Sequence, residues 1–142
     1  MCIRDSFKDF ASCATLIKAS DEDIDALAGK NAEENFVADC FSHGASIVYI
    51  TRGSEGAGVY TTDGGSFNAL SKPVKVKDTV GAGDTFQAAV LHWMAAENHI
   101  GSDGSLTGRV DAEASLNFAL NAAAVTCSRF GADLPTLADL QT

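Results

Sequence analysis

The sequence predicts an α/β fold in which helices flank a mainly parallel sheet. Residues 46–51 are nearly all β-branched or apolar, which is typical of a strand buried on both faces of a parallel sheet. A shorter strand-like run at residues 14–18 precedes it, and two helix-like segments lie between the two runs. Strands that alternate with helices in this way indicate parallel βαβ units.

Composition narrows the class of protein. Of the 142 residues, 46% are apolar and 20% are charged, which predicts one globular domain with a substantial core. The net charge of −9 argues against a protein that binds nucleic acid or an anionic membrane through its charge. A bound anion must therefore be held locally, and backbone N–H groups suit that task without adding net charge.

The cysteines and the start of the chain predict the compartment. Cys2, Cys13, Cys40 and Cys127 form no Cys-x-x-Cys pair, so neither a zinc site nor a redox motif is predicted. No apolar run approaches the length of a membrane span, and the charged start does not look like a signal peptide. We expect a soluble, cytoplasmic protein with reduced thiols and no membrane partner.

The first elements are predicted in order along the chain. Residues 1–13 are a poorly defined start, of which residues 1–6 are expected to be loosely ordered. The strand at residues 14–18 then leads into a helix. Ser20 and Asp23 are spaced to form a capping box, in which each side chain accepts a hydrogen bond from the other residue's backbone N–H.

A second helix and a glycine-rich loop surround the strand at residues 46–51. The helix has Phe36, Val37 and Cys40 on one face. The loop begins at the end of the strand, at the place where α/β proteins bind ligands, but it also reads as a plain hairpin turn. Two short strands, residues 66–70 and residues 73–77, are then expected at an antiparallel edge of the sheet.

The strongest candidate site is the stretch at residues 78–86, which precedes a helical apolar pattern. Gly81 and Gly83 allow backbone angles that other residues avoid, and a helix start leaves unpaired N–H groups that favour an anion such as phosphate. Asp84 either caps the helix or accepts a proton from a hydroxyl that attacks phosphorus. The stretch lacks the Lys-Ser/Thr pair of a Walker A loop and the third glycine of a dinucleotide fingerprint.

Two helices separated by a loop at residues 98–108 complete the prediction. In the first helix Phe86, Val90 and Met94 share one face, so packing anchors the helix that carries Asp84. The second helix is rich in alanine and begins at a cap formed by Asp111.

Residues 78–86 have the form Asp-Thr-x-Gly-Ala-Gly-Asp-x-Phe, and on this motif the sequence resembles the PfkB, or ribokinase-like, sugar kinases. The loop after the central strand matches the family's Thr-x-Gly-x-x-Gly, and residues 18–23 look like the fructokinase-type form of its Asn-x-x-Glu motif. The resemblance covers nearly all of residues 14–142. It implies that this part is the C-terminal, nucleotide-binding and catalytic portion of a ribokinase-like domain.

The resemblance implies ATP-dependent phosphoryl transfer to a sugar hydroxyl, most like that of a fructokinase, with Mg²⁺ and a monovalent cation such as K⁺. Asp84 would be the catalytic base, and the anion hole would consist of the backbone N–H groups of Gly81, Ala82, Gly83 and Asp84. The residues implied in nucleotide binding are Thr51, Gly53, Gly56, Ala119, Leu120 and Ala123. Those implied in cation binding are Ser20 and Asp23 for magnesium, through water, and Asp78, Val80 and Gly131 for the monovalent ion.

Two other interpretations stay open at this point. The chain could be a noncatalytic nucleotide-binding or regulatory module, because the family's N-terminal portion makes most of the sugar contacts. It could also fail to fold alone, since removing half a sheet exposes strand edges and apolar surface. The partners implied for the full-length protein are ATP, fructose or a similar sugar and a second copy in a homodimer, without nucleic acid.

Overall fold

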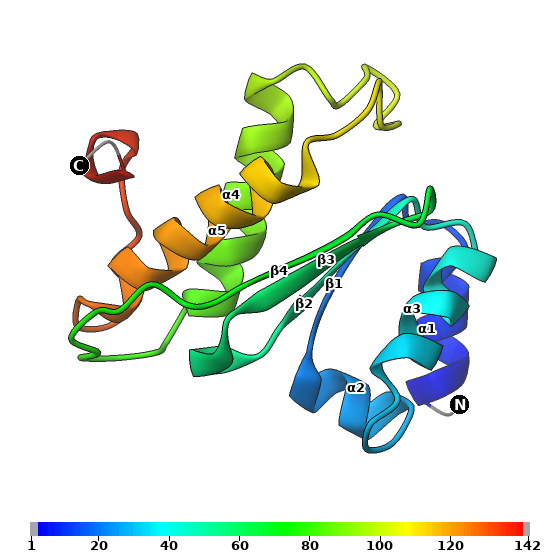
Figure 1. Cartoon of the computed structure of the whole chain (residues 1–142), viewed down its shortest axis with the longest axis horizontal. Coiled ribbons are helices and arrows are strands. Elements are labelled where there is room, and N and C mark those ends of the chain that lie inside the picture. Colours follow the sequence, from blue (N-terminus) through cyan, green and yellow to red (C-terminus); the bar gives the residue numbers. More distant parts are fainter. Residues whose placement is uncertain (1–2, 141–142) are drawn as a thin grey trace.

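A four-stranded mixed sheet forms the centre of the computed structural model, which describes the backbone of residues 3–140 and the side chains of residues 6–140 (Figure 1). The strands are β1 (Leu16–Ser20), β2 (Ile47–Thr51), β3 (Ala57–Thr61) and β4 (Ser66–Ala69), in that spatial order. β1 and β2 are parallel, whereas the pairs β2–β3 and β3–β4 are antiparallel. The α/β prediction is confirmed, and the antiparallel part of the sheet is larger than the edge we expected.

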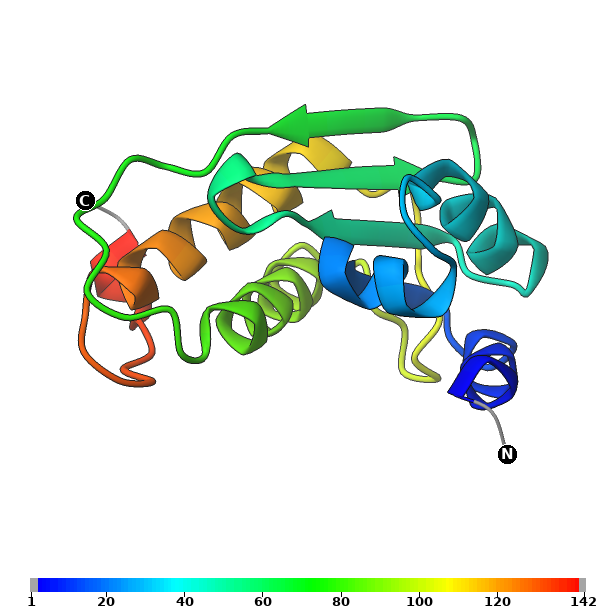
Figure 2. The same cartoon turned by 90° about the horizontal axis from the view of Figure 1, so that it is seen from below.

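Helices cover both faces of the sheet. α4 (Ala82–Ala96) and α5 (Ala112–Cys127) pack on one face, and α1 (Ile3–Ala11), α2 (Asp21–Leu27) and α3 (Glu33–Ser42) lie on the other side (Figures 1 and 2). Two short 3₁₀ helices, η1 (Gly53–Glu55) and η2 (Leu137–Leu140), complete the elements. No helix in residues 3–140 is long and apolar enough to span a lipid bilayer.

The apolar run of β2 is buried on both faces, as its sequence predicts. Ile47 and Tyr49 belong to the core beneath α4 and α5, whereas Val48 and Ile50 belong to the core beneath the other three helices. This division follows from the alternation of side chains along a strand. Because β1 and β2 run in parallel with Ser20 opposite Thr51, the two strands end side by side, and both lead into predicted site segments.

The predicted disorder at the start of the chain is wrong for the residues that the structure describes. Residues 3–11 form α1, and Ala11 is fully buried. The ring of Phe7 packs against Phe36 of α3, with 5.2 Å between the ring centroids. The sequence itself carried a signal that was missed, because Ile3, Phe7, Phe10 and Ala11 recur at helical spacing. Contact with α3 holds this helix in place, and Met1 and Cys2 lie outside the described residues.

A second difference concerns residues 73–77, where we expected an edge strand and the structure has none. Pro73 cannot donate to a strand ladder. Further along, the N–H of Lys77 donates to the carbonyl of Cys127 at the end of α5, at 2.8 Å. The segment therefore leaves the sheet after β4 and crosses to α5, which brings it over the cleft described below.

Candidate active site

A cleft of about 590 Å³ opens where β1 and β2 end. Its walls come from the β1–α2 junction, the loop after β2, residues 71–79, the start of α4 and one face of α5. The predicted site residues that line it are Ser20, Thr51, Gly53, Gly56, Ala82, Gly83, Leu120 and Ala123. Segments as far apart in the sequence as Ser20 and Ala123 thus meet at the edge of the sheet where ligands bind in α/β folds.

α4 begins from a tight turn whose geometry requires a glycine. Gly81 has φ 80° and ψ 0°, the angles of the third residue of a type II turn, and the N–H of Ala82 closes the turn on the carbonyl of Thr79 at 3.2 Å. A residue with a side chain would be strained at Gly81. The turn also corrects the predicted anion hole, because the N–H of Ala82 is already engaged within the backbone.

Three N–H groups of the predicted anion hole remain available. Within the described part of the chain, the backbone N–H groups of Gly81, Gly83 and Asp84 have no hydrogen-bond acceptor. They stand at the positive end of α4, which is fifteen residues long, so the helix dipole adds to their attraction for an anion.

Gly83 is a glycine for a reason that the sequence did not reveal. Its backbone is not in the positive-φ region, so the argument from special backbone angles applies to Gly81 and is wrong for Gly83. A Cβ at Gly83 would lie 3.3 Å from Nζ of Lys18 on β1, closer than Cβ atoms usually approach. The missing side chain therefore leaves room between the start of α4 and the lysine.

Asp84 is the third residue of α4, and its side chain is exposed. The residue at the cap position is Gly81, and no side chain caps the helix, so the interpretation of Asp84 as a cap is wrong. The carboxylate is not turned into the interior and is not part of the cleft wall, although Gly83 beside it is. The carboxylate is therefore accessible to a hydroxyl that approaches from solvent.

Ser20 and Asp23 form the predicted capping box at the start of α2. The N–H of Asp23 donates to Oγ of Ser20 at 3.0 Å, and the N–H of Ser20 donates to Oδ2 of Asp23 at 2.9 Å. The backbone N–H of Ser20, followed by its hydroxyl, lowers the pKa of the Asp23 carboxyl. Ser20 lines the cleft together with the exposed residues Asp21 and Glu22, whereas Asp23 itself does not.

The acidic residues of this junction suit a hydrated magnesium ion rather than a directly bound one. No group of three potential metal ligands occurs among residues 3–140. Magnesium commonly keeps several waters and takes one or two carboxylates plus substrate phosphates, so a preformed protein cage is not required. The carboxylates that follow Ser20 could hold such waters at the cleft.

The loop between β2 and β3 is the hairpin connection that the sequence allowed, and it also forms part of the cleft wall, while its role in ligand binding stays a prediction. Gly56 has φ 97°, and a Cβ there would lie 2.0 Å from the carbonyl oxygen of Ala69. Only glycine allows β4 to pass so close. The hydroxyl of Ser71 donates to the carbonyl of Gly53 at 2.9 Å and fastens the loop to the segment that crosses above it.

The apolar wall of the cleft is formed by α5 and the crossing segment. Leu120 and Ala123 line it as expected, but Ala119 does not: its side chain is fully buried in the core, on a different face of α5. The lining residues that were not predicted as site residues include Lys18, Val74, Val76, Ala124 and Cys127. The alternation of Val74 and Val76 with lysines indicated a segment with one apolar side, but we interpreted that pattern as a strand at the edge of the sheet.

The residues predicted to hold a monovalent cation lie together. The N–H of Val80 donates to Oδ1 of Asp78 at 3.0 Å, and the N–H of Gly131 donates to Oδ2 at 3.0 Å. These backbone donors, first that of Val80, lower the pKa of the Asp78 carboxyl. Each carboxylate oxygen accepts one backbone hydrogen bond and keeps a second lone pair, so both the carboxylate and nearby backbone carbonyl oxygens could contact a cation here.

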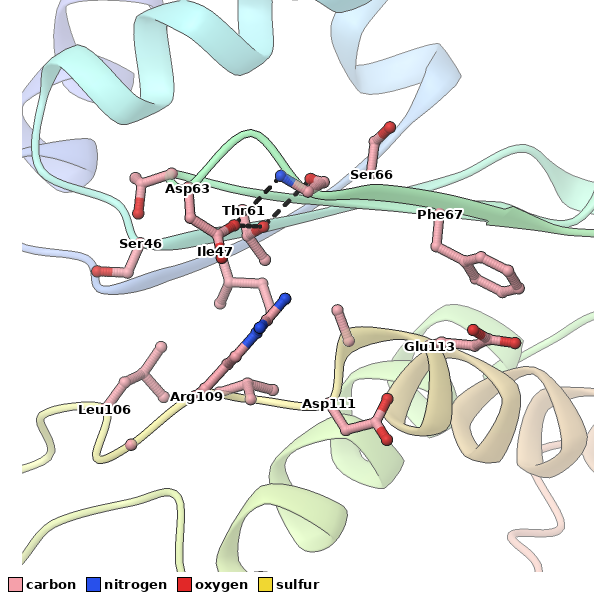
Figure 3. Close-up of a pocket in the computed structure, with 15 residues that line it drawn as sticks. Ser46, Ile47, Thr61, Asp63, Ser66, Phe67, Leu106, Arg109, Asp111 and Glu113 are labelled. Atoms are coloured by element: carbon pink, nitrogen blue, oxygen red, sulfur yellow. Dashed lines mark hydrogen bonds between the residues drawn. The ribbon is translucent and has the colours of Figure 1, made fainter.

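A larger cleft, of about 880 Å³, opens at the opposite end of the sheet (Figure 3). Arg109 points there toward Thr61 and Asp63, whose side chains are hydrogen-bonded to each other at 2.5 Å. This cleft lies beside the start of β2 and contains none of the predicted site residues. The smaller cleft is therefore the better candidate for an active site.

Comparison with known proteins assigns the family. The pattern of the pfkB family carbohydrate kinases matches residues 2–139, almost the whole chain. The chain belongs to the pfkB family. This PfkB chain is 41% identical, over 91 residues, to a fructokinase from Rhizobium leguminosarum bv. trifolii, a match that covers 64% of the chain and 28% of the relative. It is 27% identical, over 135 residues, to a 5-dehydro-2-deoxygluconokinase from Bacillus licheniformis, covering 92% of the chain and 38% of the relative.

A solved fructokinase structure has the same fold. The fructokinase from Vibrio cholerae O395, solved with fructose, ADP and calcium, matches with a TM-score of 0.80 at 24% identity. The match covers 97% of the chain and 43% of the fructokinase chain. The chain thus spans less than half the length of these relatives, and the ribokinase-like fold predicted from the sequence is confirmed for the part it spans.

Proposed function

We propose that this chain is the nucleotide-binding and catalytic part of an ATP-dependent sugar kinase, most like a fructokinase. The observation that carries the proposal is the start of α4, where three unpaired backbone N–H groups adjoin the free, exposed carboxylate of Asp84. Unpaired amides at a helix start attract a phosphoryl group, and a carboxylate beside them would repel it unless it took part in the reaction.

The proposed reaction transfers the γ-phosphoryl group of ATP to a sugar hydroxyl. The hydroxyl oxygen forms a bond to the γ-phosphorus as the bond from that phosphorus to the β,γ-bridging oxygen breaks, and ADP leaves with the electron pair. The hydroxyl proton passes to Asp84. The N–H groups of Gly81, Gly83 and Asp84 stabilise the negative charge on the transferred group. Positioning and charge stabilisation supply most of the catalysis.

The rest of the cleft would hold the nucleotide. Thr51, Gly53 and Gly56 form the loop proposed to contact it, and the apolar wall at Leu120 and Ala123 suits an adenine ring. Ser20 and Asp23, with the acids between them, would hold the waters of a magnesium ion, which neutralises charge on the phosphates when bound. A K⁺ ion near Asp78, Val80 and Gly131 stays a prediction.

The sugar is proposed by similarity alone. Relatives of the chain include a fructokinase and a 5-dehydro-2-deoxygluconokinase, and the former has the higher identity over its shorter match. Fructose is therefore the first substrate to test, and 5-dehydro-2-deoxygluconate is the second.

A noncatalytic nucleotide-binding module is the alternative function. It is favoured by one observation: Asp84 is exposed and lies outside the wall of the cleft, so the described residues build a nucleotide site more fully than a sugar site. Calorimetry with ATP and with fructose separates the two proposals. Binding of ATP without binding or phosphorylation of either sugar would support the module as the function of these 142 residues, and phosphorylation of a sugar by them would contradict it.

The base is tested by Asp84→Asn, with Asp25→Asn on the exposed side of α2 as the matched control. We expect Asp84→Asn to lower the rate of phosphate transfer from ATP to the sugar by about 10²- to 10⁴-fold, the usual contribution of a general base. ATP affinity should change little, because the amides remain. Unchanged turnover in Asp84→Asn would rule out the assigned role.

A further inference from the structure

Lys18 occupies an unusual position for a lysine. It is the central residue of β1, it is only partly exposed, and it stands opposite Tyr49, which is fully buried beneath α4 and α5. Its neighbours in sequence, Ile17 and Ala19, point to the other face of the sheet and are buried there. The side chain of Lys18 is thus directed to the α4 side, into the candidate cleft whose wall it helps to form.

The ammonium group of Lys18 has no ion-pair partner among the described residues. A buried charge is normally compensated by a partner. Because the partly buried Lys18 has no such ion-pair partner, its charge is available for a ligand. The positive charge of Lys18 also helps to lower the pKa of Asp23 in the first turn of α2, although the hydrogen bonds from Ser20 have the larger effect. Lys72 also lines the cleft, but its side chain is exposed and its ammonium donates to Oδ1 of Asn121 at 3.1 Å.

The ammonium lies directly beside the start of α4. The Cβ position at Gly83 is 3.3 Å from Nζ of Lys18, and the N–H of Gly83 is one of the three unpaired amides. A cation and several backbone donors therefore converge on one place from two elements, β1 and α4. Such a combination fits a phosphate group, which accepts charge-assisted hydrogen bonds from several sides.

We propose that Lys18 binds the terminal phosphate of the nucleotide and stabilises its charge during transfer. This inference rests on the proposed kinase function and adds a residue to it. Lys18 keeps its proton throughout and donates hydrogen bonds to phosphate oxygens, while Asp84 receives the proton of the sugar hydroxyl. The absence of a side chain at Gly83 lets the phosphate reach both the lysine and the amides.

The test compares Lys18→Met with Lys75→Met in the 142-residue chain, because Lys75 is exposed and is not part of the cleft wall. We expect Lys18→Met to weaken ATP binding by about 10- to 100-fold, in line with the loss of a charge-assisted contact. Adenosine, which has no phosphate, should bind about equally to both variants and to the wild type. Lys18→Arg should retain part of the ATP affinity.

Each outcome bears on one claim. Equal ATP affinity in Lys18→Met and the wild type would overturn the role of Lys18 and leave the kinase proposal intact. The same conclusion would follow if Lys18→Met lost affinity for ATP and for adenosine by the same factor. Failure of the wild type to bind ATP would overturn the proposed function and this inference with it. If Lys18→Met does not fold, acetylation of the wild type decides: ATP should protect Lys18 and leave Lys75 reactive, and equal modification of both with ATP present would contradict the proposal.

Discussion

The guanidinium of Arg52 is bound by both carboxylate oxygens of Glu33. Nε donates to Oε2 at 3.0 Å and Nη2 donates to Oε1, which also accepts a hydrogen bond from the hydroxyl of Tyr60. Arg52 lies inside the glycine loop between Thr51 and Gly53, so this ion pair ties the loop to the first turn of α3. Because the pair is bidentate and partly buried, it should hold the loop in place better than an ordinary surface salt bridge would.

Glu33→Gln is predicted to loosen the glycine loop. We expect the free energy of unfolding to fall by about 1 kcal/mol, since one strong but partly solvated pair is weakened. ATP affinity should fall as well, because Arg52 no longer fixes the loop that contacts the nucleotide. Chemical denaturation and ATP titration measure the two effects, with the exposed Glu34→Gln as control. Equal behaviour of the two variants would show that the pair does not position the loop.

The same pair predicts how stability depends on pH. The hydrogen bond from Arg52 is the main cause that lowers the pKa of Glu33, and Ser20 lowers that of Asp23. A carboxyl with a lower pKa in the folded state stabilises the fold above its unfolded pKa, and this stabilisation disappears as the pH falls through its folded pKa. The denaturant concentration at the unfolding midpoint should therefore decrease when the pH is lowered past 4.5 and then 3.8, the ordinary pKa values of Glu33 and Asp23. The decrease should be smaller in Glu33→Gln. An equal decline in both proteins would contradict this.

Gly56→Ala is predicted to destabilise the protein strongly. Its Cβ would overlap the carbonyl oxygen of Ala69, and φ is 97°. Strain and overlap together should cost about 3 kcal/mol or more. Gly64 is a matched control, because its φ is 85° but a Cβ there would meet no other atom within 4 Å. Gly64→Ala should cost only about 1 kcal/mol, so similar losses in the two variants would show that the approach of β4 is not the decisive factor.

Gly83→Ala is predicted to separate stability from nucleotide binding. Alanine favours the helix, so the free energy of unfolding should rise by up to about 1 kcal/mol. The added Cβ would crowd Nζ of Lys18 and block the approach of a phosphate to the amides, so ATP affinity should fall. Thermal melting and ATP titration of one preparation test both parts. An affinity as high as that of the wild type would mean that the space beside Gly83 has no role in binding.

Local sequence was enough to predict several elements and motifs correctly. The continuous apolar run of β2 predicted burial on both faces, and the spacing of Ser20 and Asp23 predicted the capping box that the structure contains. The glycines at residues 78–86 predicted a turn into a helix start. Each of these features depends on contacts within a few residues, so the local pattern specifies it.

Other features depended on which distant residues meet. The helix that carries Phe7 is held in place because Phe36 lies against it, and Ala119 faces the core because that side of α5 packs on α4 and the sheet. The availability of only three amides follows from how the turn before α4 closes, and the place of Lys18 follows from the pairing of β1 with β2.

Patterns of neighbouring residues were enough to establish the α/β class, the family and the chemical identity of the groups at the start of α4. Tertiary structure alone decided that Lys18 stands beside Gly83, that Ala119 is unavailable to a ligand and that residues 73–77 cover a cleft instead of extending the sheet. The physical reason is that backbone angles and caps follow from neighbours in the chain. The direction in which a side chain points and the residues that it contacts follow from packing between elements far apart in sequence.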